Sequence, residues 1–396
     1  MKDHIHPGIA EATRLTQQGR LDEATAAIQR ALGGTFTPAA QEDTGDTNGP
    51  IEVISRLVRE SPQGPAGTRR TDVSRPGAAA WTTPGPTLLT RGVQLPPGTK
   101  AGKLASVIVP EGGRFVERSY TNSAGTRSYK LYIPSGYIGQ VVPLIVMLHG
   151  CTQNPDDFAA GTRMNERAEE HTFLVAYPAQ AGNANIQKCW NWFQAADQQR
   201  GRGEPSLIAG ITRQVVDEYE VAEDRVYVAG MSAGGAMAAI MGATYPDLYA
   251  AIGVHSGLAP RSAHDLSSAF TAMRQGGPVV AAPNEEHTEI VPTIVFHGDR
   301  DTTVHPRNGE RLLAIAGGQN GSSPRVRTRQ GRAPGGYEYT RYSYHDANDR
   351  ALLERWSVHG LGHAWSGGSY PGSYTDPRGP DASAEMVRFF EQHRKR

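Results

Sequence analysis

One serine in this chain stands where a nucleophile would stand. Ser232 is the centre of the five residues 230–234, Gly-Met-Ser-Ala-Gly, which follow a run with β-branched residues and precede a run of small residues that favours a helix. Glycine two positions before and two positions after the serine lets a strand and a helix pack around a strained turn. The hydroxyl would then lie at a helix N-terminus, where developing negative charge is stabilised. The pattern predicts Ser232 as the nucleophile of an acyl transfer, although such a five-residue motif is common by itself.

A serine hydroxyl needs a base to take its proton and a third group to orient that base. An acid for the third role is found downstream, where the predicted strand 293–296 runs into His-Gly-Asp-Arg-Asp at 297–301. Two carboxylates compete here. We favour Asp301, because it lies deeper in the turn, and expect Asp299 to cap the turn.

The base is expected last, on the loop that follows the final strand. Residues 352–358 predict that strand, and the loop reads His-Gly-Leu-Gly-His-Ala-Trp from residue 359. His363 is flanked by Gly362 and Ala364, so its imidazole has room to reach Ser232. We expect His359 to belong still to the end of the strand.

Acyl transfer also requires N–H donors for the oxyanion. The backbone N–H of Ala233, directly after the nucleophile, is one candidate. The other is the N–H of Cys151, because the apolar strand 142–149 ends in His-Gly, as oxyanion loops do. We expect His149 to shape this loop and not to act as a base.

The elements that must position these groups alternate along residues 106–396. Strands are expected at 128–134, 142–149, 173–177, 225–229, 250–254, 293–297 and 352–358, with helices near 155–170 and 204–219, after Ser232, and from Asp381 onward. Such alternation predicts an α/β domain with a mostly parallel sheet covered by helices on both faces. Catalytic groups should then gather at the carboxyl ends of the strands.

Two further zones precede this domain. Residues 1–32 have a helical apolar spacing with a Gln-Gly-Arg turn at 18–20, which predicts a helical hairpin too small to bury its own apolar face. We expect residues 8–32 to pack on the main domain or to associate with another copy or a partner. Residues 33–105 are dense in Gly, Pro, Thr and Ala and predict a linker.

The composition excludes several classes of function. Lys plus Arg and Asp plus Glu both number 40, so no global field attracts nucleic acid. No apolar run is long enough to span a membrane. The first residues lack the apolar stretch of a secretory signal, which predicts a cytoplasmic protein. The two cysteines, Cys151 and Cys189, have no zinc-ligand spacing, so no metal site is expected.

The combined motifs resemble those of the polyhydroxybutyrate (PHB) depolymerase family of esterases, to which feruloyl and acetylxylan esterases are related. The resemblance covers about residues 106–396 and rests on Leu-His-Gly-Cys-Thr-Gln at 148–153, Cys-Trp-Asn-Trp at 189–192, the run 225–237 and Gly-His-Ala-Trp-Ser-Gly-Gly at 362–368. It implies an α/β-hydrolase fold, no cofactor, and the triad Ser232, Asp301 and His363. It also implies that Cys151 and Cys189 lie close together and pair in a disulfide, the alternative being two free thiols.

The resemblance implies an ester substrate: a short-chain polyhydroxyalkanoate such as poly-3-hydroxybutyrate, or its oligomers. The alternatives are a feruloyl or acetylxylan-type carbohydrate esterase and a non-catalytic protein that binds a polymer granule or a partner. Better-known members of the family are secreted, which is the alternative to the cytoplasmic location. Trp190 and Trp192 are candidates for a substrate wall, although core packing is the default for both, and Trp365 is expected to border the acyl pocket.

Overall fold

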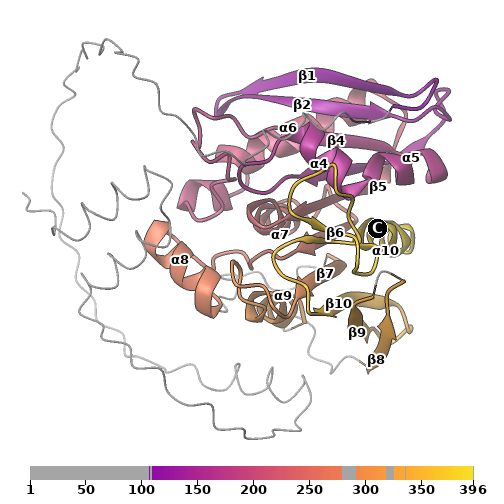
Figure 1. Ribbon diagram of the computed structural model, residues 1–396. Coiled ribbons are helices and arrows are strands. Elements are labelled where there is room, and N and C mark those ends of the chain that lie inside the picture. The colour runs from indigo at the N-terminus through magenta and orange to yellow at the C-terminus, as the bar shows by residue number, and fades with distance from the viewer. Residues whose placement is uncertain (1–106, 108, 279–290, 318–324, 335, 396) are drawn as a thin grey trace, which may run out of the picture. The chain divides into compact units, whose positions relative to one another are not determined.

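A ten-stranded β-sheet organises the molecule, with strand order β1-β2-β4-β3-β5-β6-β7-β10-β9-β8 (Figure 1). The computed structural model describes residues 107, 109–278, 291–317, 325–334 and 336–395, which all fall in one compact unit, Thr83–Arg396. The strands are β1 (Arg114–Asn122), β2 (Gly125–Ile133), β3 (Val142–Leu148), β4 (Leu174–Pro178), β5 (Val221–Met231), β6 (Ala251–His255), β7 (Thr293–Gly298), β8 (Arg325–Arg332), β9 (Glu338–His345) and β10 (Ala351–His359).

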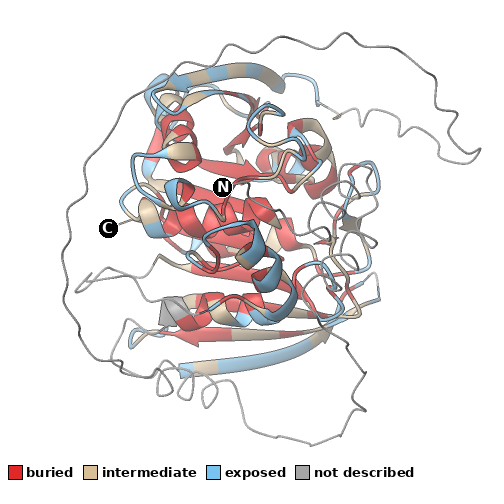
Figure 2. Ribbon diagram, turned by 90° about the vertical axis from the view of Figure 1, so that its left-hand side faces the viewer, coloured by how far each residue is buried: buried red, intermediate tan, exposed pale blue. Residues whose placement is uncertain are grey.

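The six central strands are parallel, and antiparallel strands complete the sheet at both edges. β2 pairs antiparallel with β4 and β1, while β9 pairs antiparallel with β10 and β8. Strands β6 and β7 are buried at every residue, as is typical of parallel strands covered on both faces. Figure 2 shows this buried centre between two edge strands without buried residues: β1 is a mixture of exposed and half-buried residues, and most residues of β8 are exposed.

Helices cover both faces of the sheet. They are α4 (Pro155–Thr162), α5 (Met164–His171), α6 (Gly203–Glu218), α7 (Ala233–Thr244), α8 (Leu266–Gln275), α9 (Arg307–Gly317) and α10 (Ala382–Glu391), with a short 3-10 helix, η1 (Ala195–Gln198), before α6 and a two-stranded sheet of β11 (Trp365–Ser366) and β12 (Thr375–Asp376). Alternate strand residues enter two separate cores, one under α6, α7 and α9 and the other under α4, α5 and α10. The expected α/β fold with a covered, mostly parallel sheet is confirmed.

Most predicted elements lie within one or two residues of the observed ones. The closing helix begins as expected, because the Asp381 side chain accepts a hydrogen bond of 2.9 Å from the Ala384 N–H. The single helix predicted near 155–170 is wrong in one respect: it is two helices, broken at Arg163, which has the left-handed conformation (φ 58°). Strand β1, helices α8 and α9 and the hairpin β8–β9 were not predicted.

Four loops follow the carboxyl ends of the parallel strands, which all lie at the same end of the sheet. Met231 at the end of β5 lies opposite His255 at the end of β6, and Gly298 of β7 lies opposite Val358 of β10. The loop after β3 begins at the same edge, since Leu148 pairs with Gly230. The predicted serine, acid, histidine and oxyanion loops therefore start from neighbouring strand ends.

Candidate active site

Ser232 occupies a strained turn between β5 and α7. Its backbone has φ 55° and ψ −119°, a conformation that non-glycine residues seldom adopt. The turn is held because the Ser232 N–H donates to the His255 carbonyl at 2.9 Å. This geometry places Ser232 as the N-cap of α7 and half-buried at the sheet edge. Strain of this kind at a helix N-terminus is typical of a nucleophile elbow.

The two flanking glycines are required by close backbone approach. A Cβ atom on Gly230 would lie 2.3 Å from the Gly234 carbonyl oxygen, and one on Gly234 would lie 2.0 Å from the Leu148 carbonyl oxygen. Both distances are far below van der Waals contact. The sequence motif is thus explained by packing: β5, α7 and the end of β3 meet with no space for a side chain.

The predicted oxyanion loop lies beside the serine. A Cβ atom on Gly150 would be 3.5 Å from the Cβ of Ser232, so Gly150 passes directly next to the nucleophile. The Gly150 N–H donates to Oε1 of the buried Gln153 at 2.9 Å, which fixes the turn into the loop. Ala233 is the first residue of α7, where helical N–H groups have no intrahelical acceptor. We keep the backbone N–H groups of Cys151 and Ala233 as the proposed oxyanion donors.

His149 is held in one neutral tautomer. The Gln180 N–H donates to its Nε2 at 3.1 Å, so the other ring nitrogen, Nδ1, carries the proton and donates to the Gly150 carbonyl at 2.8 Å. Complete burial lowers the pKa of His149 to about 4, against the smaller opposite effect of its bond to Gly150. Both nitrogens are used in shaping the loop, which agrees with the role expected for His149.

A disulfide joins Cys151 to Cys189, as the resemblance implied. Next to it, the Trp190 indole N–H donates to the His149 carbonyl at 3.1 Å, and the Thr152 N–H donates to the Gln187 carbonyl at 2.6 Å. One covalent bond and two hydrogen bonds thus tie the segment 187–190 to the oxyanion loop.

Asp301 and His363 form the predicted acid–base pair. Nδ1 of His363 lies 2.7 Å from Oδ2 of Asp301. The other carboxylate oxygen accepts the N–H groups of Thr303 and Val304, at 2.9 and 2.8 Å, so the side chain is fixed at both oxygens. Asp301 is 4% exposed, whereas His363 is half-buried. The free Nε2 of such a histidine is the atom that would take the serine proton.

A second histidine, His297, packs against Asp301 and was not predicted as part of the site. Its Nε2 donates to the Val304 carbonyl at 2.7 Å and lies 3.5 Å from Oδ2 of Asp301. Burial raises the pKa of the Asp301 carboxyl, but hydrogen bonds from His297 and His363 outweigh burial and hold that pKa well below its usual range. Asp301 therefore stays ionised and can stabilise a protonated His363. The sequence carries no signal for this contact, because it depends on how the turn 298–304 closes.

Asp299 has a different role. Its Oδ1 accepts the Gly360 N–H at 2.7 Å, and its Oδ2 lies 3.0 Å from Nδ1 of His359. It therefore binds the start of the histidine loop and does not cap its own turn, which corrects the expectation. His359 is the last residue of β10, as predicted.

The loops that carry the candidate residues contact one another. The Arg300 N–H donates to the Leu361 carbonyl at 3.1 Å, which joins the acid turn to the histidine loop. The Tyr374 ring meets the His363 ring edge-on at 6.5 Å, and its hydroxyl lies 3.2 Å from Oγ1 of Thr152 in the oxyanion loop. Tyr374 is half-exposed and was also missed by the sequence reasoning, since it follows a Gly- and Ser-rich stretch with no motif.

The three candidate tryptophans lie inside the protein. Trp190, Trp192 and Trp365 are 0%, 5% and 1% exposed. The Trp365 ring stacks on His255 at 4.9 Å and meets Phe158 edge-on at 5.5 Å. Trp365 thus packs among buried residues next to the histidine loop, and the expectation that it borders the acyl pocket stays a proposal. Trp190 and Trp192 belong to the core of the opposite face of the sheet.

Within the described part of the chain, no group of three or more His, Cys, Asp or Glu side chains could hold a metal ion. The arrangement of Ser232, the Asp301–His363 pair and the loop at Gly150 contains the groups that nucleophilic acyl transfer requires.

Comparison with known proteins agrees with this class of fold and site. Acetyl xylan esterase from Aspergillus awamori superposes with a TM-score of 0.53 at 20% identity, covering 70% of this chain and 99% of the other, which shows an α/β-hydrolase fold. Residues 127–329 match the family model of the esterase PHB depolymerases. The chain belongs to that family.

Curated relatives carry different names. Poly(3-hydroxyalkanoate) depolymerase C of Paucimonas lemoignei is 32% identical over 254 residues, which are 61% of this chain and 59% of the relative. Feruloyl esterase B of Neurospora crassa is 31% identical over 202 residues (47% and 68%), and acetylxylan esterase A of Talaromyces purpureogenus is 28% identical over 202 residues (47% and 52%). The chain thus spans between half and two thirds of the length of most of these relatives.

Proposed function

We propose that this protein is a serine esterase that forms an acyl-enzyme through Ser232. The observation that carries the proposal is the Asp301–His363 pair at 2.7 Å, on a loop that starts at the same sheet edge as the strained Ser232 turn. Neutral His363 takes the Ser232 proton as the oxygen attacks the ester carbonyl, and then gives that proton to the leaving alcohol. Ionised Asp301 stabilises the imidazolium that forms between these steps.

The oxyanion of each tetrahedral intermediate is bound by the N–H groups of Cys151 and Ala233. Water then attacks the acyl-enzyme with His363 again as the base, which releases the acid and restores Ser232. None of these steps requires a cofactor. The disulfide Cys151–Cys189 and the bond from Trp190 to His149 hold the first donor in place before substrate binds.

The substrate that we propose is a short-chain polyhydroxyalkanoate, poly-3-hydroxybutyrate, or its soluble oligomers. Support comes from the depolymerase relative at 32% identity. A carbohydrate ester, either a feruloyl or an acetyl ester of xylan, is the second candidate, because relatives with those names are 31% and 28% identical. Both substrates use the same proposed triad, so only the acyl and alcohol pockets distinguish them.

Two experiments test this proposal. Ser232→Ala should lower the hydrolysis of p-nitrophenyl acetate by several orders of magnitude without changing the melting temperature, and full activity in this folded variant would disprove the nucleophile. Initial rates on hydroxybutyrate oligomers, amorphous polymer, methyl ferulate and acetylated xylan then rank the two substrate classes. A higher kcat/KM for ferulate or xylan would replace the polyester by the carbohydrate ester.

The place of action follows from the disulfide. Disulfides persist in oxidising compartments and are rare in the cytosol. We therefore infer an extracellular location from the bond Cys151–Cys189, in place of the cytoplasmic location expected from the first residues. No helix in the described ranges is long and apolar enough to cross a membrane.

The remaining predictions concern residues outside the described part of the chain. These are the helical hairpin 1–32, the linker 33–105, the domain start at 106, and association through residues 8–32. They stay proposals. Sedimentation of the full chain and of a chain starting at residue 106 would test the association: an equal number of chains per particle in both samples would contradict it.

A further inference from the structure

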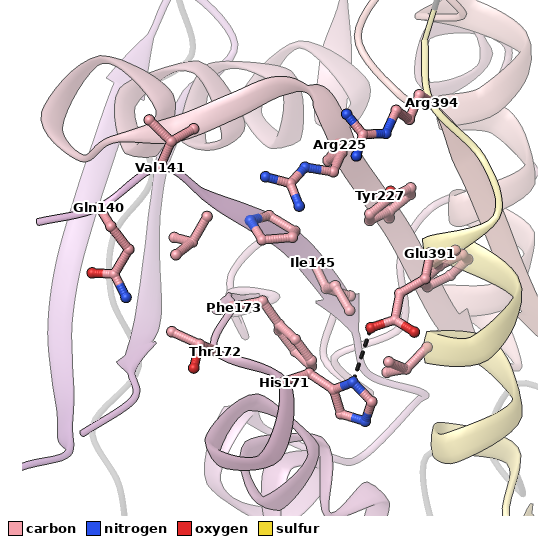
Figure 3. Close-up of a pocket in the computed structure, with 14 residues that line it drawn as sticks. Gln140, Val141, Ile145, His171, Thr172, Phe173, Arg225, Tyr227, Glu391 and Arg394 are labelled. Atoms are coloured by element: carbon pink, nitrogen blue, oxygen red, sulfur yellow. Dashed lines mark hydrogen bonds and ion pairs between the residues drawn. The ribbon is translucent and has the colours of Figure 1, made fainter. Parts of the chain in front are cut away.

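A cavity lies near the opposite end of the central strands from Ser232. It has a volume of about 320 Å³ and is lined by the first residues of β3, the middle of β5, the turn before β4 and the carboxyl end of α10 (Figure 3). Ser232 follows Met231, the last residue of β5, whereas Arg225 and Tyr227 of the cavity come from the middle of that strand. The cavity is therefore separate from the candidate active site.

Arg225 is the unusual side chain of this cavity. Its Nε atom is buried and has no hydrogen-bond partner. Three other arginines with a buried, unpartnered Nε each have a carboxylate within 4 Å: Arg167 with Glu170, Arg350 with Asp346, and Arg355 with Glu310. Within the described ranges, no carboxylate pairs with Arg225. A guanidinium that is partly withdrawn from water without an anion is costly, and a bound anion would remove that cost.

The other charged groups around the cavity are already paired. Arg394 lies 3.3 Å from Asp224, and Nδ1 of His171 lies 2.9 Å from Oε1 of Glu391. In Figure 3 the two arginines lie at one end and the His171–Glu391 pair at the other. Arg225 is thus the guanidinium of this cavity that has no carboxylate partner within the described ranges, and one carboxylate ligand would match it.

Apolar side chains form the surface between these two ends. Ile145 and Phe173 lie in the middle of the cavity (Figure 3), and the Tyr227 ring stacks on Phe390 at 4.8 Å along its wall. A cavity with the unpartnered Nε of Arg225 at one end and apolar side chains beside it fits a ligand with a short hydrocarbon body and one anionic head. Its volume limits that body to a short chain.

We propose that this cavity binds a short-chain carboxylic acid, with its carboxylate on the Arg225 guanidinium and its alkyl chain on Ile145 and Phe173. The planar fork of an arginine matches a carboxylate in two parallel hydrogen bonds. A phosphate would bring more negative charge than one free guanidinium offsets, and would have no use for the apolar wall. This inference goes beyond the proposed esterase activity and does not depend on it.

The test uses the full chain with hexanoate as the probe and hexanamide as its neutral match, titrated by ligand-observed NMR. Hexanoate should bind saturably with a Kd of about 1 mM, the affinity that a few apolar contacts and one ion pair provide. Hexanamide should bind about tenfold more weakly or worse. Absence of saturable hexanoate binding in the native protein would overturn the proposal.

Three variants locate the binding. Arg225→Gln should weaken hexanoate at least about tenfold and abolish its preference over hexanamide, whereas Arg225→Lys should retain most of the affinity. Arg167→Gln is the matched control, since it removes an arginine with a buried Nε that lines no part of the cavity. Hydrolysis of p-nitrophenyl acetate by Arg225→Gln should equal that of the native protein, which separates this site from the esterase site. Equal hexanoate affinity in Arg225→Gln and native protein would place the ligand elsewhere and refute the assignment.

Discussion

Two aspartates lie two residues apart on the turn after β7, and each has its own histidine. Asp301 is buried and meets His363 at 2.7 Å, while Asp299 is exposed and meets His359 at 3.0 Å. The chemistry of both pairs is the same, but His363 of the first pair contacts Tyr374, whose hydroxyl lies 3.2 Å from Oγ1 of Thr152 in the oxyanion loop. We therefore assign the catalytic acid by where each pair lies in the fold. Single substitutions of the two aspartates test this assignment.

Asp301→Asn should lower kcat for p-nitrophenyl acetate by about 10⁴-fold, because the amide neither fixes the tautomer of His363 nor stabilises its protonated form. Asp299→Asn is the matched change on the same turn. It removes one charge from the contact with His359 and should leave kcat within about threefold, as expected for an exposed pair. Steady-state kinetics of both folded variants decides between them. A larger loss in Asp299→Asn would transfer the catalytic role to the second pair.

At the scale of elements, the site is built from the ends of four strands and is fixed by contacts between their loops. The oxyanion loop after β3 carries the greatest number of such constraints: the disulfide, the Trp190 bond, the Thr152 bond to Gln187 and the Gln180 bond to His149. The disulfide and the Trp190 bond tie the Cys189–Trp192 segment to the loop that carries the backbone N–H of Cys151, the proposed oxyanion donor.

Removal of the disulfide should therefore affect both stability and rate. The bond closes a loop with a sequence separation of 38 residues, which corresponds to about 4 kcal/mol of unfolding free energy when only chain entropy is counted. The double variant Cys151→Ser, Cys189→Ser should be less stable by about this amount in urea unfolding. Its kcat should fall about tenfold with KM nearly unchanged, because a displaced oxyanion donor acts mainly in the transition state.

The single variant Cys189→Ser separates these effects, because it leaves Cys151 unchanged in the loop. It should behave like the double variant. Native kcat in the double variant would show that the hydrogen bonds alone position the loop. Native stability would show that the disulfide does not constrain the unfolded chain.

The sequence predicted those elements that carry a clear local signal, either an apolar run or a helix cap. Strands β3, β5 and β7 have long apolar runs, and α10 has a capping aspartate, so their positions could be read directly. β8 could not be predicted, because an edge strand exposed on most of its length has no apolar pattern. The break between α4 and α5 lies at an arginine in the left-handed conformation, where a glycine would have been the usual signal.

For the site, the order of motifs along the chain was sufficient to choose Ser232, Asp301 and His363 as candidates. The contacts of His297 with Asp301, of Tyr374 with His363 and of Gln180 with His149 depend on how the loops fold, and no motif in the sequence indicates them. The burial of Trp365 was missed for the same reason: its neighbour His255 comes from a different strand.

At the scale of the whole molecule, three buried histidines have a lowered pKa: His149, His255 and His393, and burial lowers the pKa of His393 to about 4. Burial lowers the pKa of His149 to about 4 and that of His255 to about 3, the latter with a smaller effect from the neighbouring His297. An unfolded histidine has a pKa of about 6.5. Between these values the unfolded chain binds more protons than the folded chain, so acid favours unfolding.

The free energy of unfolding should therefore be constant above about pH 7 and decrease as the pH falls from about 6.5 toward 4. At pH 5 each of these histidines should cost about 2 kcal/mol relative to pH 7. Urea unfolding at the two pH values measures the difference, and His149→Gln should reduce it by about a third. The ionisation of Asp301 does not contribute in this interval, because the stabilisation from its lowered pKa is lost only below about pH 4. Equal stability at pH 7 and pH 5 would contradict the neutral burial of the three rings.

The exposed edge strand β8 affects whether two molecules of this protein associate. It carries four arginines in eight residues, Arg325, Arg327, Arg329 and Arg332, and only β9 pairs with it among the described strands. An open strand edge is a template for pairing with a second molecule, and like charges along it oppose that approach. Dynamic light scattering should find single particles at low ionic strength and growing assemblies as salt screens the arginines. Replacing Arg327 and Arg329 by threonine should lower the salt concentration at which assembly begins. The arginines of β8 would then be the groups that keep the protein molecules apart in solution.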